Sequence, residues 1–523
     1  MIMWDNRDSY LKTLYRIVAG LSVIICLCTS CSVAKSSFNP LKKYSPAELQ
    51  KDYAVFRGAL EETHPGIYWY TPKEVMDEYF EWGEERLKDS MNEDEFKKTL
   101  SYVIAKINCG HTVVRNSKDY SRFQDSTTRF KIFPLSMKIW SGNEPLADDT
   151  VTIAANLNRK DSILKRGIVV EKINNQPVSI LVDTFFKYIS SDGYNYTHKQ
   201  QSLSNRGSFG TAYTSLFGLK ENYIIDYIDS SGVEKTIKIP SYNPRTDTAN
   251  RAAVARFGRI PKEERRRQLL QSARNLRIDS ANKAAFLDLG SFARGLKLKR
   301  FFRQSFKKIQ QSDAKNLVVD VRGNGGGSVT NSTTLSKFIA NKKFKLADSL
   351  YAPRRNSDYK RYIDNYFFNR LFMVLMTKKK SDGKFHFGYF ERHYFKPKKK
   401  RRFDGTVYIL IGGNSFSATT LFTQAVKDQQ NVIVVGEETG GGAYGNSAWL
   451  IPDATLPVTG IRFRLPLFRL VINKNIPKDG KGIQPEIEVK PTVDAIRRGA
   501  DFKMEKVMEL INVANSKSNY TRE

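Results

Sequence analysis

Apolar and polar positions alternate with helical spacing in the first part of the chain after residue 44. Three signatures of helix starts open these patterns, each with a capping-type residue followed three positions later by glutamate. They are Ser45-Pro46-Ala47-Glu48, Thr71-Pro72-Lys73-Glu74 and Asn92-Glu93-Asp94-Glu95. The pattern predicts an N-terminal helical unit over residues 45–115.

The hydrophobic pattern changes from about residue 125 to short β-type runs separated by turns. The run at 167–173 is followed by Asn174 and Asn175, a typical turn pair. We therefore predict a β-rich unit over residues 125–242. Residues 245–282 are crowded with arginine and are expected to form a basic linker or helix.

Strongly apolar runs alternate with helical patterns over residues 283–490. Such alternation is typical of a sheet covered by helices. A basic insert at about 345–403 interrupts this core, and residues 491–523 are expected to form a C-terminal helix or tail. The predicted fold class is α/β and multidomain.

The N-terminus has the pattern of an export signal. Lys12 and Arg16 precede an apolar stretch, residues 17–28, that is too short to span a membrane. Residues 27–31 resemble a bacterial lipoprotein cleavage site, which implies a signal peptide over 1–30, a lipid on Cys31 and a linker over 31–44. We expect a lipid-anchored protein of the bacterial cell envelope, facing the periplasm or on the outer membrane. An uncleaved amphipathic anchor or a plain secretory signal remains the alternative.

Composition narrows the choice of partners. The chain has 85 Lys and Arg against 54 Asp and Glu, a net charge of +31, which favours anionic surroundings or forms a solvated basic face. With an export signal, nucleic acid is not the expected partner. Four cysteines exclude a disulfide framework, and five histidines without zinc-type spacing predict neither a structural metal nor a cofactor.

Two glycine-rich loops follow apolar strands in the core. One is Gly323-Asn324-Gly325-Gly326-Gly327 after the run at 316–322, and the other is Gly412-Gly413 before Asn414-Ser415-Phe416-Ser417. Bare amides in such loops can bind a phosphate or a developing oxyanion. Ser417 would stand at a helix N-terminus, where it could equally be an ordinary cap. In acyl transfer, a nucleophile and an oxyanion hole must converge on one carbonyl group. The glycine-rich loop and the Ser417 loop, each at the end of a strand, could supply these two parts, so together they indicate acyl transfer.

These segments resemble the serine peptidase family of the C-terminal processing (tail-specific) proteases, the tricorn protease core and the interphotoreceptor retinoid-binding repeats. The resemblance implies a crotonase-like α/β core, and residues 164–178 resemble the PDZ-like domain of many members. A PDZ-like unit would present an extended peptide or an unfolded protein to the site by strand addition. The matching segments lie at 319–327, 414–418, 434–442 and 482–487.

The resemblance also implies roles for single residues. Ser417 matches the nucleophile, and the amides of Gly326 and Ala418 match the oxyanion donors. The processing proteases have a lysine base where this chain has Gly442, so the chain is closer to the tricorn-like branch, in which a histidine acts. His111 matches that histidine, and Asp479 fits the acid that orients it.

Several alternatives remain open at this level. His64 is the rival base, Ser415 a fallback nucleophile, and Cys109 is more typical of a buried, inert thiol. Histidines 198, 386 and 393 lack matching motifs and are expected at the surface. A catalytically inactive peptide- or ligand-binding protein on the same fold is the alternative function.

Overall fold

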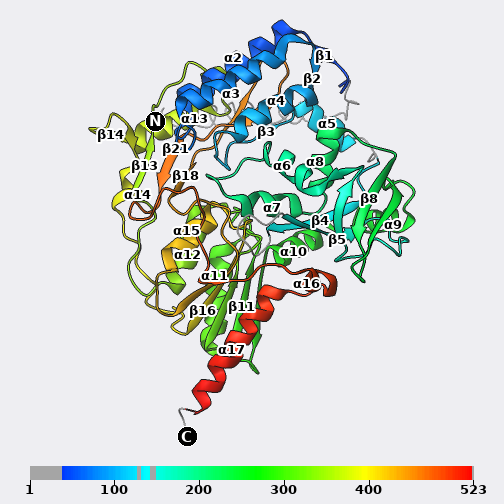
Figure 1. The fold of residues 1–523 in the computed structure, drawn as a ribbon. Helices are drawn as coiled ribbons and strands as arrows, with labels where there is room; N and C mark the ends of the chain where they lie inside the picture. Colours follow the sequence, from blue (N-terminus) through cyan, green and yellow to red (C-terminus); the bar gives the residue numbers. More distant parts are fainter. Residues whose placement is uncertain (1–37, 127–130, 142–148, 259, 521–523) are drawn as a thin grey trace, which may run out of the picture.

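The structure, a computed structural model, describes residues 38–126, 131–141, 149–258 and 260–520 (Figure 1). The predicted signal peptide, residues 1–30, and the predicted lipid site, Cys31, lie outside the described residues. The fold is α/β, as predicted, with several sheets and packed helices.

Two of the three predicted helix starts have the expected capping geometry. In α2 (Pro46–Thr63) and α4 (Glu93–Ala105), Ser45 and Asn92 form complete capping boxes with Glu48 and Glu95. The third helix, α3 (Lys73–Glu85), has no side-chain cap. The Thr71 hydroxyl instead donates to the carbonyl of Lys106, 2.5 Å away, so this threonine ties the start of α3 to the end of α4.

The β-rich unit is an antiparallel sheet with the order β4-β5-β6-β8-β9, with β7 (Gln176–Pro177) paired to β6. Three helices pack on it and share its own apolar core. The strands are β4 (Leu135–Ser141), β5 (Asp149–Asn156), β6 (Val169–Ile173), β8 (Asn222–Ile228) and β9 (Glu234–Pro240). The helices are α6 (Val178–Phe186), α7 (Tyr196–Ser204) and α8 (Ser208–Phe217).

The central sheet has the order β10-β11-β12-β16-β17-β22 and is parallel except for β10. Its first strand, β10 (Arg274–Asp279), lies within the stretch predicted as a linker, which otherwise forms α9 (Thr248–Gly258) and α10 (Lys262–Ala273). The linker prediction is therefore wrong for its last residues. The other strands are β11 (Ala284–Leu289), β12 (Asn316–Asp320), β16 (Thr406–Ile411), β17 (Val432–Gly436) and β22 (Ile487–Glu488).

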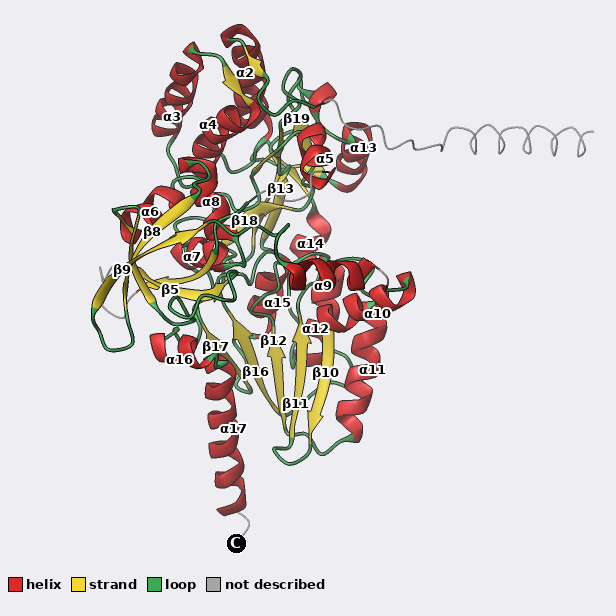
Figure 2. Cartoon of the chain, turned by 90° about the vertical axis from the view of Figure 1, so that its right-hand side faces the viewer, coloured by secondary structure: helices red, strands yellow, loops and turns green. Residues whose placement is uncertain are grey.

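Helices cover both faces of this sheet (Figure 2). One face packs against α11 (Leu298–Gln311), α12 (Val329–Ile339) and α15 (Ala418–Val426). The other face packs against α17 (Phe502–Tyr520), which follows α16 (Val493–Arg498). Both loops that carry the predicted chemistry follow the carboxyl ends of neighbouring parallel strands, β12 and β16, so they meet at one edge of the sheet.

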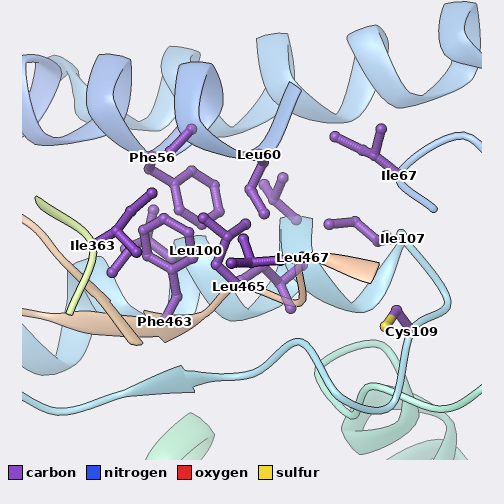
Figure 3. Close-up of a cluster of buried hydrophobic side chains, with 14 of the residues drawn as sticks. Phe56, Leu60, Ile67, Leu100, Ile107, Cys109, Ile363, Phe463, Leu465 and Leu467 are labelled. Atoms are coloured by element: carbon purple, nitrogen blue, oxygen red, sulfur yellow. The ribbon is translucent and has the colours of Figure 1, made fainter. Parts of the chain in front are cut away.

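The basic insert does not form a unit of its own. Its strand β13 (Ser349–Ala352) pairs with β21 (Phe468–Val471), and Ile363 packs with Phe56 and Leu100 of the N-terminal helices (Figure 3). The insert and the chain around 445–472 therefore complete the core of the N-terminal unit. The remaining elements here are η2 (Lys360–Tyr362), α13 (Tyr366–Met376), β14 (Lys378–Lys379), β15 (Phe385–His386), α14 (Gly388–Arg392), β18 (Gly445–Ala448), β19 (Asp453–Thr455) and β20 (Arg462–Arg464).

Candidate active site

Ser417 stands at the sharp turn between β16 and α15. Its φ of 58° and ψ of −117° lie in a region that side chains other than glycine rarely adopt. Its side chain makes no capping hydrogen bond to the helix. A strained serine on a strand-to-helix turn is the geometry of a nucleophile elbow, and the ordinary N-cap interpretation does not hold.

Ser415, the fallback nucleophile, has a structural role. Its side chain is fully buried, its hydroxyl donates to the carbonyl of Val321 at 2.8 Å, and it accepts the amide of Gly412 at 3.1 Å. These bonds hold the β16 loop against the end of β12. A hydroxyl committed in this way is not available for attack.

Gly326 lies directly against Ser417 and Ala418. A Cβ built on Gly326 would come within 2.8 Å of the Ser417 Cβ and 2.9 Å of the Ala418 nitrogen, and its φ is +96°. The two predicted oxyanion residues are thus adjacent, although the Gly326 amide donates to Asn324 Oδ1 at 3.0 Å. A substrate oxyanion would have to displace that side-chain acceptor to use the Gly326 amide.

The loop after α4 brings His111 to the same place. The imidazole packs against the ring of Phe416, the residue before Ser417, with 4.7 Å between ring centroids. Both ring nitrogens of His111 are buried and have no hydrogen-bond partner among the described residues, so no bond to Ser417 is formed. Burial, with the charges of Arg464, His198 and Arg469, lowers the pKa of His111 to about 3, which keeps the ring neutral.

Asp192, which the sequence did not indicate, is the acid beside His111. Its Oδ1 lies 3.9 Å from Nδ1 of His111, and its carboxylate accepts the amides of Gly110 at 2.9 Å and Gly442 at 3.2 Å. Burial raises the pKa of Asp192. The loop between α6 and α7 that carries Asp192 has no motif, so only its docking against the His111 loop could reveal it.

Asp479 does not take the predicted place. Its side chain is exposed, and its carboxylate accepts the amide of Lys481, two residues further on. No ion pair joins Asp479 to His111 in the described part of the chain, whereas Asp192 does make this contact. Its short-range bond satisfies the Asp479 carboxylate within its own loop.

His64 is a structural histidine. Its Nδ1 accepts the amide of Gly66 at 3.2 Å, so Nε2 carries the proton and donates to Thr112 Oγ1 at 2.8 Å. Both nitrogens of this buried ring are satisfied, in contrast to those of His111. The geometry thus favours His111 as the base.

The predicted surface position is wrong for two other histidines. His198 is half-buried, stacks on Phe416 with 5.1 Å between centroids, and its Nδ1 contacts the carbonyl of Gly413 at 2.7 Å. His386 is buried and pairs with Glu391 at 2.6 Å. His393 is half-buried against Tyr389. The ring of Phe416 therefore contacts two imidazoles, one on the loop after α4 and one in α7.

A buried arginine lies behind this site. Arg469 is 2% exposed, and its guanidinium stacks 3.4 Å from the ring centroid of Trp69. Nη1 donates to Ser447 Oγ at 3.3 Å, whereas Nε and Nη2 have no partner among the described residues. Its charge helps to lower the pKa of His111.

Cys109, His111 and Asp192 are the only described trio of His, Cys, Asp and Glu side chains close enough to suggest a metal site. Their ligand atoms lie within 4.8 Å of one another. Burial raises the pKa of Cys109 to about 11, against the thiolate form that a metal requires. The thiol lies at the edge of the apolar cluster (Figure 3). The trio fits a histidine and its orienting acid better than a metal centre.

Comparison with known proteins identifies this core. Residues 283–489 match the family model described as peptidase family S41. The core of the chain, residues 283–489, is thus similar to peptidase family S41. This similarity supports a peptidase function, and the matched residues contain the Gly326 loop, the Ser417 turn and the strands that carry them. No curated protein matches the sequence.

Solved structures extend the likeness beyond the matched core. Mature CPAF complexed with lactacystin has a TM-score of 0.61 at 14% identity, covering 89% of this chain and 98% of that chain. Mature CPAF alone has a TM-score of 0.60 with the same identity and coverage. A putative peptidase from Parabacteroides merdae ATCC 43184 has a TM-score of 0.44 at 15% identity, covering 90% of this chain and 97% of that chain. CPAF shares the fold of this chain over nearly its whole length.

Proposed function

We propose that this protein is a serine-type peptidase of the S41 kind, which hydrolyses peptide bonds in proteins or peptides at the cell envelope. Ser417 would attack the peptide carbonyl, and His111 would take the hydroxyl proton and pass it to the leaving amine. Asp192 would orient His111 and stabilise its protonated form, in place of Asp479. Water would then release the acyl-enzyme.

The conformation of Ser417 carries the proposal. A φ of 58° costs free energy of about 1–3 kcal/mol for a residue other than glycine, and a serine that only capped the helix would not need it. The Ser417 side chain makes no bond to its own helix, and a Cβ built on Gly326 would lie only 2.8 Å from the Ser417 Cβ, so the two loops approach closely. This is the arrangement in which attack and oxyanion stabilisation occur at one carbonyl.

Two changes must accompany substrate binding. The imidazole of His111, which packs on Phe416 and makes no bond to Ser417, has to come within hydrogen-bond reach of Ser417 Oγ. The Gly326 amide has to leave Asn324 Oδ1 for the oxyanion. Catalytic hydrogen bonds often tighten only in the complex with substrate.

Labelling with a fluorophosphonate tests the proposal. We expect Ser417 to be modified, and Ser417→Ala to abolish labelling and lower peptide hydrolysis by roughly a thousandfold or more. The matched control is Ser415→Ala, which removes a buried hydroxyl two residues away and should keep the labelling. Labelling at neither serine, together with no hydrolysis of any peptide tested, would refute the serine mechanism.

An inactive binding protein on the same fold is the second candidate. Two observations favour this candidate. His111 makes no hydrogen bond to Ser417, and the Gly326 amide already donates to Asn324 Oδ1. Such a protein would bind peptides without being labelled, and Ser417→Ala would leave its peptide affinity unchanged. The β-rich unit over residues 125–242 would present the extended peptide in both cases.

We further propose that lipid on Cys31 anchors the protein to the cell envelope, facing the periplasm or on the outer membrane. The short apolar stretch before a cysteine supports this location. Metabolic labelling with a fatty acid should mark the wild-type chain and leave Cys31→Ser unmarked. Equal labelling of both chains would argue against this attachment site.

A further inference from the structure

Helix α13, within the basic insert, exposes a group of large apolar side chains. Phe367, Phe368 and Leu375 are 68%, 69% and 72% exposed, and Leu371 and Val374 are also exposed. Only Met373 of this 11-residue helix is buried. Folded proteins seldom leave such a group in water unless it contacts a partner or a membrane.

The spacing of these residues places them on one side of the helix. At 100° per residue, positions 367, 368, 371, 374 and 375 form a stripe about 120° wide. Phe372 lies outside the stripe and packs on Phe387, with 5.6 Å between ring centroids. The helix is thus attached by one side and presents a continuous apolar stripe on another.

Positive charge borders the stripe. A cavity of about 390 Å³ beside α13 is lined by Arg354, Arg355, Asn356, Arg370, Val374 and Phe385. Among the described residues, no carboxylate forms an ion pair with Arg355 or Arg370, whereas Arg354 pairs with Glu62 at 2.7 Å. Exposed Lys378 and Lys379 follow the helix directly.

The guanidinium groups in this cavity are held in place by neutral acceptors. Arg370 Nε donates to Asn356 Oδ1 at 2.6 Å, Arg355 Nε donates to Thr377 Oγ1 at 3.0 Å, and Arg355 Nη2 donates to the carbonyl of Thr377. Their remaining N–H groups are therefore oriented while their charge is uncompensated. Such a pair is suited to the oxygens of a phosphate group.

The beginning of the described chain lies close to the start of α13. Phe38 lines the same cavity, of about 770 Å³, as Arg361, Tyr362 and Asp364, which precede the helix. Phe38 lies seven positions after Cys31, and a chain of that length spans at most about 25 Å when extended. A lipid on Cys31 would therefore attach within reach of the side of the molecule that carries α13.

We infer that α13 is a membrane-docking surface for anionic phospholipid. Its apolar stripe enters the interface between headgroups and acyl chains, and the cavity formed with Arg355 and Arg370 takes a headgroup phosphate. No described helix is long and apolar enough to cross a membrane. A second copy of this chain is the less suitable occupant, because it would bring two uncompensated arginine clusters together in a protein of net charge +31.

Vesicle co-sedimentation tests the inference with the full chain carrying Cys31→Ser, so that no lipid is attached. Binding should be stronger to vesicles containing phosphatidylglycerol than to pure phosphatidylcholine. Adding Phe368→Ser, Leu371→Ser and Leu375→Ser should weaken it about tenfold or more. The control chain carries Ile180→Ser, Val233→Ser and Leu269→Ser, three equally exposed apolar residues elsewhere, and should bind as the parent does.

A second set of substitutions addresses the charge. Arg370→Gln with Lys378→Gln and Lys379→Gln should remove most of the preference for phosphatidylglycerol and the salt dependence. Unchanged binding in both sets, or an α13-dependent dimer in size-exclusion chromatography, would overturn the inference.

Membrane docking by α13 rests on the proposed envelope location and not on the chemistry of Ser417. Hydrolysis of a soluble peptide should be the same in all these chains, so the two proposals fail separately.

Discussion

The carboxylate of Asp192 lies 3.9 Å from the Nδ1 atom of His111, and the two residues come from different units of the chain. The amides of Gly110 and Gly442 hold this carboxylate in place, so its position is set by the loops on either side of it. The contact joins the N-terminal unit, the β-rich unit and the catalytic core at one point.

Asp192→Asn should therefore lower kcat by about 10²- to 10⁴-fold while changing KM little. The amide could still accept one of the two backbone bonds, but it could not stabilise a protonated imidazole. Steady-state kinetics on a peptide substrate measures the effect. Asp479→Asn is the control, because its exposed carboxylate contacts only its own loop. A large loss of kcat in Asp479→Asn alone would reverse this assignment.

Gly326→Ala should disturb the site directly. A Cβ there would lie 2.7 Å from the Phe416 carbonyl and 2.8 Å from the Ser417 Cβ, at a φ that alanine disfavours. We expect fluorophosphonate labelling to be lost and the free energy of unfolding to fall by about 1–3 kcal/mol. Gly325→Ala provides a matched control, since a Cβ there meets nothing within 4 Å. Equal behaviour of the two variants would contradict the close approach of the loops.

The pH dependence of hydrolysis should reflect the low pKa of His111. The base must be neutral, and a pKa of about 3 in place of 6.5 keeps it neutral as the pH falls through 6.5. The acid limb of kcat/KM should therefore lie below pH 6.5. Arg464→Gln removes a positive charge that lowers this pKa, so the limb should move to higher pH.

Arg462→Gln is the control for that shift, because Arg462 lies on the same strand, pairs with Asp453 and does not contribute to the pKa of His111. Profiles of kcat/KM from below pH 3 up to pH 8 compare the three chains. A limb in the Arg464 variant that coincides with that of the parent would exclude His111 as the titrating base.

Asp52→Ala should destabilise the N-terminal unit. This buried carboxylate in α2 accepts the amides of Val458 and Thr459 at 2.8 Å each and the Thr459 hydroxyl at 2.6 Å. Its loss leaves three donors without their acceptor and should cost about 2–4 kcal/mol in the free energy of unfolding. Lys51→Ala, at the exposed neighbouring position, should change it little. Urea denaturation distinguishes the two.

The sequence by itself determined the features that depend on neighbouring residues. Ser45 and Asn92 mark helix starts because each capping bond closes within three residues. The glycine loop at Gly326 and the serine turn at Ser417 follow apolar strands, and that local order was enough to predict that the two loops meet at one edge of the sheet.

Only the tertiary structure decided which side chains complete the site. The family resemblance indicates Asp479 as the orienting acid, but the backbone amide of Lys481 satisfies its carboxylate locally. Asp192 reaches His111 because two loops from separate units dock against each other, and the insert joins the N-terminal core because Ile363 packs with Phe56. Such contacts depend on burial shared between distant segments, and no short sequence pattern encodes that burial.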